Sequence, residues 1–85
     1  MSVKLVTRQV GDVTVIDAVG RITLGEGSST FREIVKDLVN KGNKKMLLNL
    51  AEVSYIDSSG IGELVSGFTS VSNAGGVLVI EPAML

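Results

Sequence analysis

The chain has 85 residues, which is enough for one small domain and one hydrophobic core but not for two domains. Eight basic and nine acidic residues give a formal net charge of −1, so no basic excess marks a nucleic-acid partner. Cysteine and histidine are both absent, which removes thiolate chemistry and the commonest general base and transition-metal ligand. We therefore expect no enzyme, no cofactor and no metal site.

The N-terminal segment predicts a β-hairpin. Residues 3–8 alternate in polarity, residues 13–19 are rich in β-branched side chains, and Gly11-Asp12 between them is typical of a tight turn. A short strand at 22–24 and a flexible loop are expected to follow.

A first helix is predicted to begin at Thr30, where Thr30 and Glu33 have the spacing of a capping box. Gly42 is a natural stop for this helix. Its apolar side chains recur at the spacing of one helical face, which should cover a sheet. They are Phe31, Ile34, Val35, Leu38 and Val39.

Residues 45–50 predict a strand that is buried on both faces and lies in the middle of a partly parallel sheet. Residues 77–80 predict a last buried strand, and Glu81-Pro82 resembles the entrance to a further helix. A second helix is expected between these strands. Its predicted core-facing residues are Ile61, Leu64, Val65, Phe68 and Val71.

This order of elements predicts an α/β fold in a single domain over residues 1–85. The expected architecture is a mixed sheet, made of the N-terminal hairpin and a parallel βαβαβ unit, with helices packed on it.

The polar stretch Asp57-Ser58-Ser59-Gly60 is the segment that could carry chemistry, because it precedes the second helix. A negative charge on Ser58 or Ser59 would meet unpaired backbone N–H groups and the positive end of the helix dipole. Asp and Ser are also the preferred helix caps in any protein, so a purely structural role is the alternative. Gly60 and Gly62 are unfavourable in a first helical turn, which a closely approaching partner backbone would explain.

Catalytic hypotheses for these residues have little support. A serine nucleophile needs a base, and neither a histidine nor a nucleophile-elbow motif is present, which leaves only a Ser-Lys hydrolase. Asp57 could also be a phospho-acceptor like that of response-regulator receivers. Receivers need further carboxylates to hold Mg²⁺, whereas Asp12 falls in the hairpin turn and Asp17 in a strand.

The combined pattern resembles the STAS family, and more narrowly the bacterial anti-sigma factor antagonists. Gly20-Arg21-Ile22 after the hairpin, the segment 47–50, the run 53–62 with its Asp-Ser-Ser-Gly element, and Gly75-Gly76 carry the resemblance. It spans nearly the whole chain.

The resemblance implies that Ser58 is a phosphorylation site and that a serine-kinase anti-sigma factor is the partner. The unmodified protein would bind this kinase and release a sigma factor, phosphorylation of Ser58 would end the binding, and a PP2C-type phosphatase would reverse it. The implied partner-binding residues are Arg21, Asp57, Ser58, Ser59, Gly60 and Gly62.

Family domains usually continue with a further helix and strand beyond the point where this sequence stops, so we expect a C-terminal truncation. Uncovered apolar sheet surface would then favour a homodimer, which exchange of segments could produce. A cytoplasmic location without membrane or nucleic-acid binding is the default expectation. The alternative function is a STAS scaffold module of a larger signalling or transport assembly, in which Ser58 stays unmodified.

Overall fold

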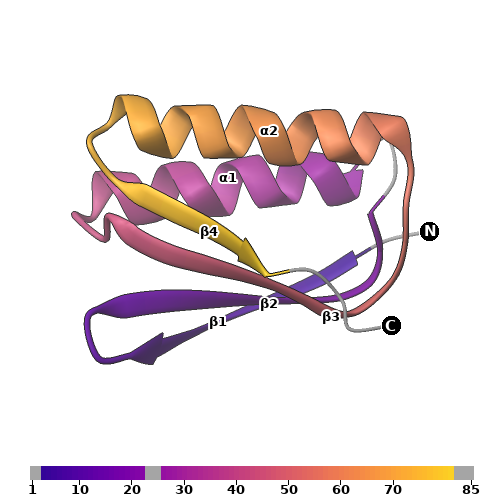
Figure 1. Cartoon of the computed structure of the whole chain (residues 1–85), viewed down its shortest axis with the longest axis horizontal. Coiled ribbons are helices and arrows are strands. Elements are labelled where there is room, and N and C mark those ends of the chain that lie inside the picture. Colours follow the sequence, from indigo (N-terminus) through magenta and orange to yellow (C-terminus); the bar gives the residue numbers. More distant parts are fainter. Residues whose placement is uncertain (1–2, 23–25, 82–85) are drawn as a thin grey trace.

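The computed structural model describes residues 3–22 and 26–81. Its described strands form one sheet with the order β1-β2-β3-β4, and both helices cover the same face of this sheet (Figure 1). This two-layer arrangement of a mixed sheet and two helices confirms the predicted fold class. In chain order the elements are β1 (Val3–Val10), β2 (Val13–Ile22), α1 (Glu26–Asn40), β3 (Lys45–Ile56), α2 (Ser58–Asn73) and β4 (Val77–Glu81).

The hairpin forms where the sequence predicts it. β1 and β2 are antiparallel, and Val10 pairs with Val13 across the turn residues Gly11 and Asp12. Gly11 has φ of 61°, a left-handed conformation that glycine adopts without strain. β2 runs without interruption to Ile22, whereas the sequence predicted a separate strand at 22–24, of which residues 23 and 24 lie outside the described residues.

The remaining strands pair in parallel, β2 with β3 and β3 with β4, through the crossover helices α1 and α2. α1 ends as predicted before Gly42, which has φ of 86°. The Gly42 N–H donates to the Val39 carbonyl at 3.0 Å, and the Asn43 N–H donates to the Leu38 carbonyl at 2.9 Å. These two bonds are those of a Schellman motif, which satisfies the last carbonyls of the helix.

The start of α1 differs from the prediction. The helix begins at Glu26, so Thr30 lies inside it and the predicted capping box does not mark its first residue. Glycine and serine are weaker helix formers than alanine by only about 0.5–1 kcal/mol each, so the tertiary context can extend a helix through them.

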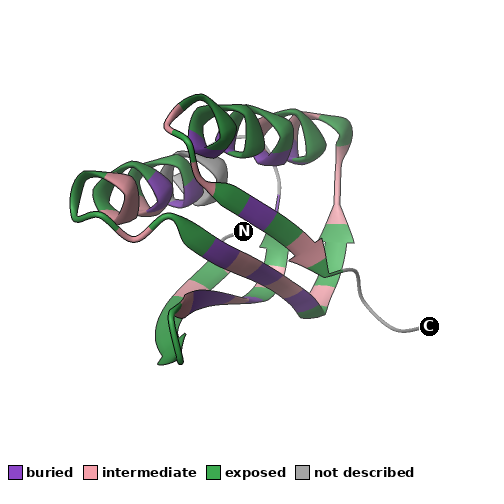
Figure 2. Cartoon of the chain, turned by 60° about the vertical axis from the view of Figure 1, so that its left-hand side comes forward, coloured by how far each residue is buried: buried purple, intermediate pink, exposed green. Residues whose placement is uncertain are grey.

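The core lies between the sheet and the two helices (Figure 2). The predicted face of α1 is confirmed, because Phe31 and Val35 are buried and the other three residues pack against the core. α1 and α2 approach each other closely at Gly67, where a Cβ atom would lie 2.5 Å from Cε2 of Phe31. The buried hydrophobic residues of the core cluster are Ile16, Ala18, Ile22, Phe31, Val35, Met46, Leu48, Leu50, Leu64, Val71 and Leu78.

The strands at 45–50 and 77–80 are not buried on both faces, which corrects the prediction. In β4, Leu78 is buried, but Val77 and Val79 are 57% and 51% exposed. Leu47 in β3 is only half-buried. The central position of β3 is confirmed, yet its second face is open because both helices pack on the other one.

Candidate functional site

Asp57 and Ser58 lie at the edge of the sheet where the parallel strands β2 and β3 end. The backbone N–H of Asp57 donates to the Ile22 carbonyl at 3.2 Å, which ties the start of α2 to the end of β2. Because parallel strands end at the same edge, Arg21 at the end of β2 lies at the same end of the sheet as Asp57 and Ser58, which follow β3.

Asp57 is the N-cap of α2. Its backbone is extended, with φ of −91° and ψ of 177°, and its Oδ1 atom accepts a hydrogen bond from the Gly60 N–H at 2.7 Å. One of the orphan donors of the helix is therefore satisfied by this carboxylate. The structural alternative of a helix cap thus explains Asp57, but it does not explain the serine that follows.

Ser58 is the first residue of α2 and is exposed, whereas Ser59 is half-buried. The Ser58 hydroxyl lies at the positive end of the helix dipole, and the capping bond of the helix is made by Asp57. An anion attached here would be stabilised by about 0.3–1 kcal/mol relative to the middle of a helix. The arrangement can therefore carry a phosphate without disturbing the core.

The two glycines of the first turns have different surroundings. A Cβ atom on Gly60 would lie 2.5 Å from the Ile22 carbonyl oxygen, so glycine at 60 allows α2 to dock on the end of β2. A Cβ atom on Gly62 would have no neighbour within 4 Å. The sequence suggested one external cause for both glycines; the structure gives Gly60 an internal cause and leaves Gly62 on an open surface.

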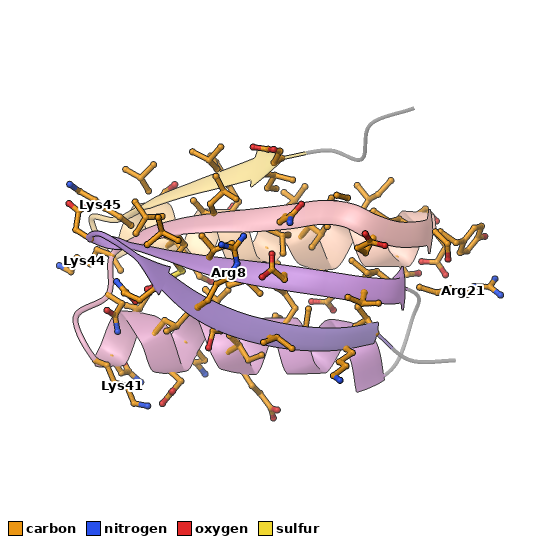
Figure 3. The ribbon with its side chains drawn as sticks, turned by 90° about the horizontal axis from the view of Figure 1, so that it is seen from below. Arg8, Arg21, Lys41, Lys44 and Lys45 are labelled. Atoms are coloured by element: carbon orange, nitrogen blue, oxygen red, sulfur yellow. The ribbon has the colours of Figure 1, made fainter. Side chains whose placement is uncertain are left out.

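Arg21 lies at the same end of the molecule and points away from it (Figure 3). Its guanidinium carbon is 4.8 Å from the centre of the Tyr55 ring, a distance typical of a cation–π contact. Arg21 and Tyr55 are register partners in neighbouring strands, which explains why they meet. Beside them the Ser54 hydroxyl donates to the Gly20 carbonyl at 3.2 Å.

An exposed apolar surface continues from Ser58 along α2, and the sequence analysis missed it. Ile61, Val65 and Phe68 are 54%, 56% and 46% exposed, although their spacing predicted a core position. We call these three residues the α2 stripe. Of the five residues predicted to face the core, only Leu64 and Val71 are buried.

Charge is scarce on this helix, and that signal was available in the sequence. Glu63 is the only charged residue of α2, and its Oε2 atom lies 2.7 Å from Nε of Arg32 in α1. Apart from Glu63, α2 therefore contributes no charged side chain to the surface around the α2 stripe. Charge depletion with exposed apolar side chains is characteristic of the core of a protein interface.

The described residues contain no cluster of metal ligands. No group of three or more acidic, histidine or cysteine side chains there could hold a metal ion. Asp12 pairs with Lys45 at 2.7 Å beside the hairpin turn, and Asp17 pairs with Arg8 at 2.6 Å within the sheet. The carboxylates that a receiver-type phospho-acceptor would need are thus engaged elsewhere.

The family model of the STAS domain matches residues 4–82. The chain belongs to the STAS domain family. A comparison with curated proteins found no match. In the described part of the chain, neither helix is long and apolar enough to cross a membrane.

Solved structures with the same fold include two described as anti-sigma factor antagonists. SpoIIAA in its unphosphorylated form is 16% identical, with a TM-score of 0.73 over 96% of this chain and 87% of that one. A Thermotoga maritima protein assigned as an anti-sigma factor antagonist is 30% identical, with a TM-score of 0.77 over 89% of this chain and 65% of that one.

The STAS domain fold also occurs within a longer chain. Mglu is 26% identical, with a TM-score of 0.79 over 89% of this chain, but the match covers only 19% of the Mglu chain. This chain therefore spans less than two thirds of two of these three structures.

Proposed function

We propose that this STAS domain is an anti-sigma factor antagonist that is switched by phosphorylation of Ser58. In this proposal the unmodified protein binds a serine-kinase anti-sigma factor and thereby releases a sigma factor. The chain is a binding module and a kinase substrate, not a catalyst. Its place of action would be the cytoplasm.

The observation that carries the proposal is the position of Ser58. It is exposed, it follows an aspartate that already caps the helix, and it borders the α2 stripe. A serine in this position is accessible to a kinase and is not needed to cap the helix. SpoIIAA, which has the same fold, has been solved in a phosphorylated form as well.

The α2 stripe is the proposed docking surface. On a helix, Ile61 and Gly62 follow Ser58 by three and four residues and Val65 by seven, so all lie on one side. The open space at Gly62 allows a partner to approach the backbone closely. The remaining residues of the proposed contact are Arg21, Asp57, Ser59 and Gly60.

Phosphorylation would act on this surface through charge. The Ser58 Oγ atom attacks the γ-phosphorus of ATP held by the kinase, the bond to the β,γ-bridging oxygen breaks, ADP leaves and the hydroxyl proton passes to a base of the kinase. The product carries about −1.5 to −2 charges beside the Asp57 carboxylate and an uncharged helix face. Repulsion and desolvation of these charges would weaken docking, and a PP2C-type phosphatase would restore it.

Mass spectrometry tests the modification directly. The protein is incubated with ATP and each of a panel of anti-sigma factor serine kinases, and phosphate is located by peptide mapping. We expect phosphate on Ser58 in the wild type and in Ser59→Ala, and none in Ser58→Ala. Phosphate on Ser59, or none with any kinase, would contradict the proposal.

The docking surface has its own test. Val65→Lys introduces a charge into the middle of the α2 stripe at a side chain that is 56% exposed, so the fold should tolerate it. We expect the affinity for the kinase to fall at least about tenfold, because substitutions at the centre of an interface commonly have effects of this size. Val79→Lys, the same change on the other side of the molecule, is the control and should leave the affinity unchanged.

A scaffold role is the second candidate, and the match to Mglu favours it. There a domain of this fold is about a fifth of a larger chain. If this chain served as such a module, the α2 stripe would bind a neighbouring domain permanently, and Ser58→Asp would affect binding no more than Ser59→Asp.

A further inference from the structure

A second apolar surface lies on the sheet, away from the helices. Both helices pack on one face of the sheet, so the other face, which we call the bare face, is not covered by any described element (Figure 1). Figure 3 views the molecule from this side. Residues that are partners in neighbouring strands point to the same face of the sheet, so the strand register shows which residues share the bare face. Apolar residues on the bare face include Val6, Val10, Val13, Leu47, Val77 and Val79.

The apolar side chains gather toward the hairpin end of the bare face. Val10, Val77 and Val79 are 52%, 57% and 51% exposed. Val13, Leu47, Val77 and Val79 line a shallow depression of about 290 Å³, together with Met46 and, as the one charged residue, Lys45. Contiguous exposed apolar surface of this kind on a small domain usually marks an interaction site.

The bare face carries charges of both signs, because the strand register places Lys4, Glu52 and Glu81 on it as well as Arg8, Asp17 and Lys45. Arg8 Nε lies 2.6 Å from Asp17 Oδ2, and Asn49 Nδ2 donates to Asp17 Oδ1 at 2.9 Å. At the hairpin end Lys45 Nζ lies 2.7 Å from Asp12 Oδ2. Because a two-fold axis places a surface against itself, an unbalanced face would repel its copy. Basic and acidic side chains are equally represented among these strand residues, so the face does not strongly repel its copy, and it has no basic excess for an acidic partner or an anionic membrane.

The area of the face agrees with a weak dimer. The Cα atoms extend over 31 × 21 × 17 Å, and the helix and sheet layers are stacked along the middle dimension in Figure 1. A face of 31 × 17 Å gives about 500 Å² per copy and about 1,000 Å² for two, the lower limit for a specific interface. Sheets commonly pack face to face at about 10 Å, with their apolar side chains interdigitated.

From these observations we propose that the bare face binds a second copy of this chain, so that two sheets form a sandwich with the helices outside. The α2 stripe and Ser58 remain accessible, because they belong to α2, which packs on the other face of the sheet from the bare face. Dimerisation and kinase docking therefore use separate surfaces. The proposal does not depend on phosphorylation, and its failure is distinguishable from failure of the switch.

Sedimentation equilibrium between about 10 and 500 μM tests the dimer, since an interface of this size is expected to be transient. We expect a reversible monomer–dimer equilibrium in the wild type. Val79→Lys in β4 and Val10→Lys in β1 should each raise the dimer Kd at least about tenfold. Val65→Lys, the matched change on the α2 stripe, should alter it less than about twofold.

Each alternative gives a different result. A wild-type monomer at all concentrations overturns the proposal, and so does a dimer that Val65→Lys disrupts. Pairing through the exposed edge of β4 would be weakened by Val79→Lys but not by Val10→Lys, and would also overturn it. Urea unfolding of each variant is measured alongside, and if Val79→Lys does not fold, Val10→Lys carries the test.

Discussion

At the residue scale, Gly60 makes the tightest contact at the candidate site. Its backbone passes so close to the Ile22 carbonyl that any side chain would meet the oxygen of a core strand. A hydrophobic pattern counts glycine as neutral, so this contact was invisible in the sequence. The contact fixes where α2 begins, and therefore where Ser58 is presented.

Replacing Gly60 tests this interpretation. Gly60→Ala places Cβ 2.5 Å from a backbone oxygen that cannot rotate away, so we expect a loss of about 1–3 kcal/mol in the free energy of unfolding. Gly62→Ala meets open space and should stabilise the helix by up to about 1 kcal/mol. Urea unfolding of both variants gives the comparison, and equal effects would show that the close contact is not formed.

The free energy of unfolding should depend on pH through the ionisation of Asp17. Hydrogen bonds from Arg8 and then from Asn49 hold the pKa of Asp17 below its usual 3.8. Because the pKa of Asp17 is lower in the folded than in the unfolded protein, its ionisation stabilises the fold fully at pH values above the unfolded-state pKa. This stabilisation is lost as the pH falls through the folded-state pKa. Wild type should therefore be more stable than Asp17→Asn at pH near 7, and the difference should shrink on titration to about pH 2.5. A difference that stays constant with pH, measured by urea unfolding, would contradict this.

At the element scale, α2 shows most clearly what the sequence could and could not predict. The length and position of the helix followed from apolar spacing, but its orientation did not. Ile61, Leu64, Val65, Phe68 and Val71 cover more than one face, whereas the face that packs inward contains Gly60, Leu64, Gly67 and Val71. Close backbone packing at glycines rotated the helix so that three apolar residues became the α2 stripe.

Two valines of α2 offer a matched comparison of its faces. Val71 is completely buried and Val65 is 56% exposed. Val71→Ala removes two buried methyl groups and should lower the free energy of unfolding by about 2 kcal/mol. Val65→Ala should change it by less than about 0.5 kcal/mol. Similar losses in both variants, measured by chemical denaturation, would show that Val65 is buried in the core and would contradict this assignment of the faces.

For the strands, too, the sequence predicted the positions better than the burial. Alternation, the Gly11-Asp12 turn and the order of elements were sufficient to predict the hairpin and the central position of β3. The run at 77–80 was expected to be buried because all four residues are apolar, and such a run does not reveal whether a second layer is present. The start of α1 was missed because the weakly helical turn before Thr30 is stabilised by its context rather than by propensity.

At the scale of the whole molecule, most of the exposed large apolar side chains form two groups, one on α2 and one on the sheet. The α2 stripe lies on the helix layer beside Ser58, and the bare face lies on the sheet layer. The STAS domain identity followed from motifs along the chain, whereas the two surfaces emerged only from the packing. This separation would let one copy bind a kinase through its helices while its sheet binds a second copy.

The central claim is that a phosphate on Ser58 abolishes docking without unfolding the domain. Its most direct test is the affinity of a serine-kinase anti-sigma factor for the unmodified and the Ser58-phosphorylated protein, measured by calorimetry, with unfolding of both forms recorded in urea. We predict at least about a hundredfold weaker binding after phosphorylation, with stability changed by less than about 1 kcal/mol. Equal affinities, or a loss of binding that accompanies unfolding, would contradict the account.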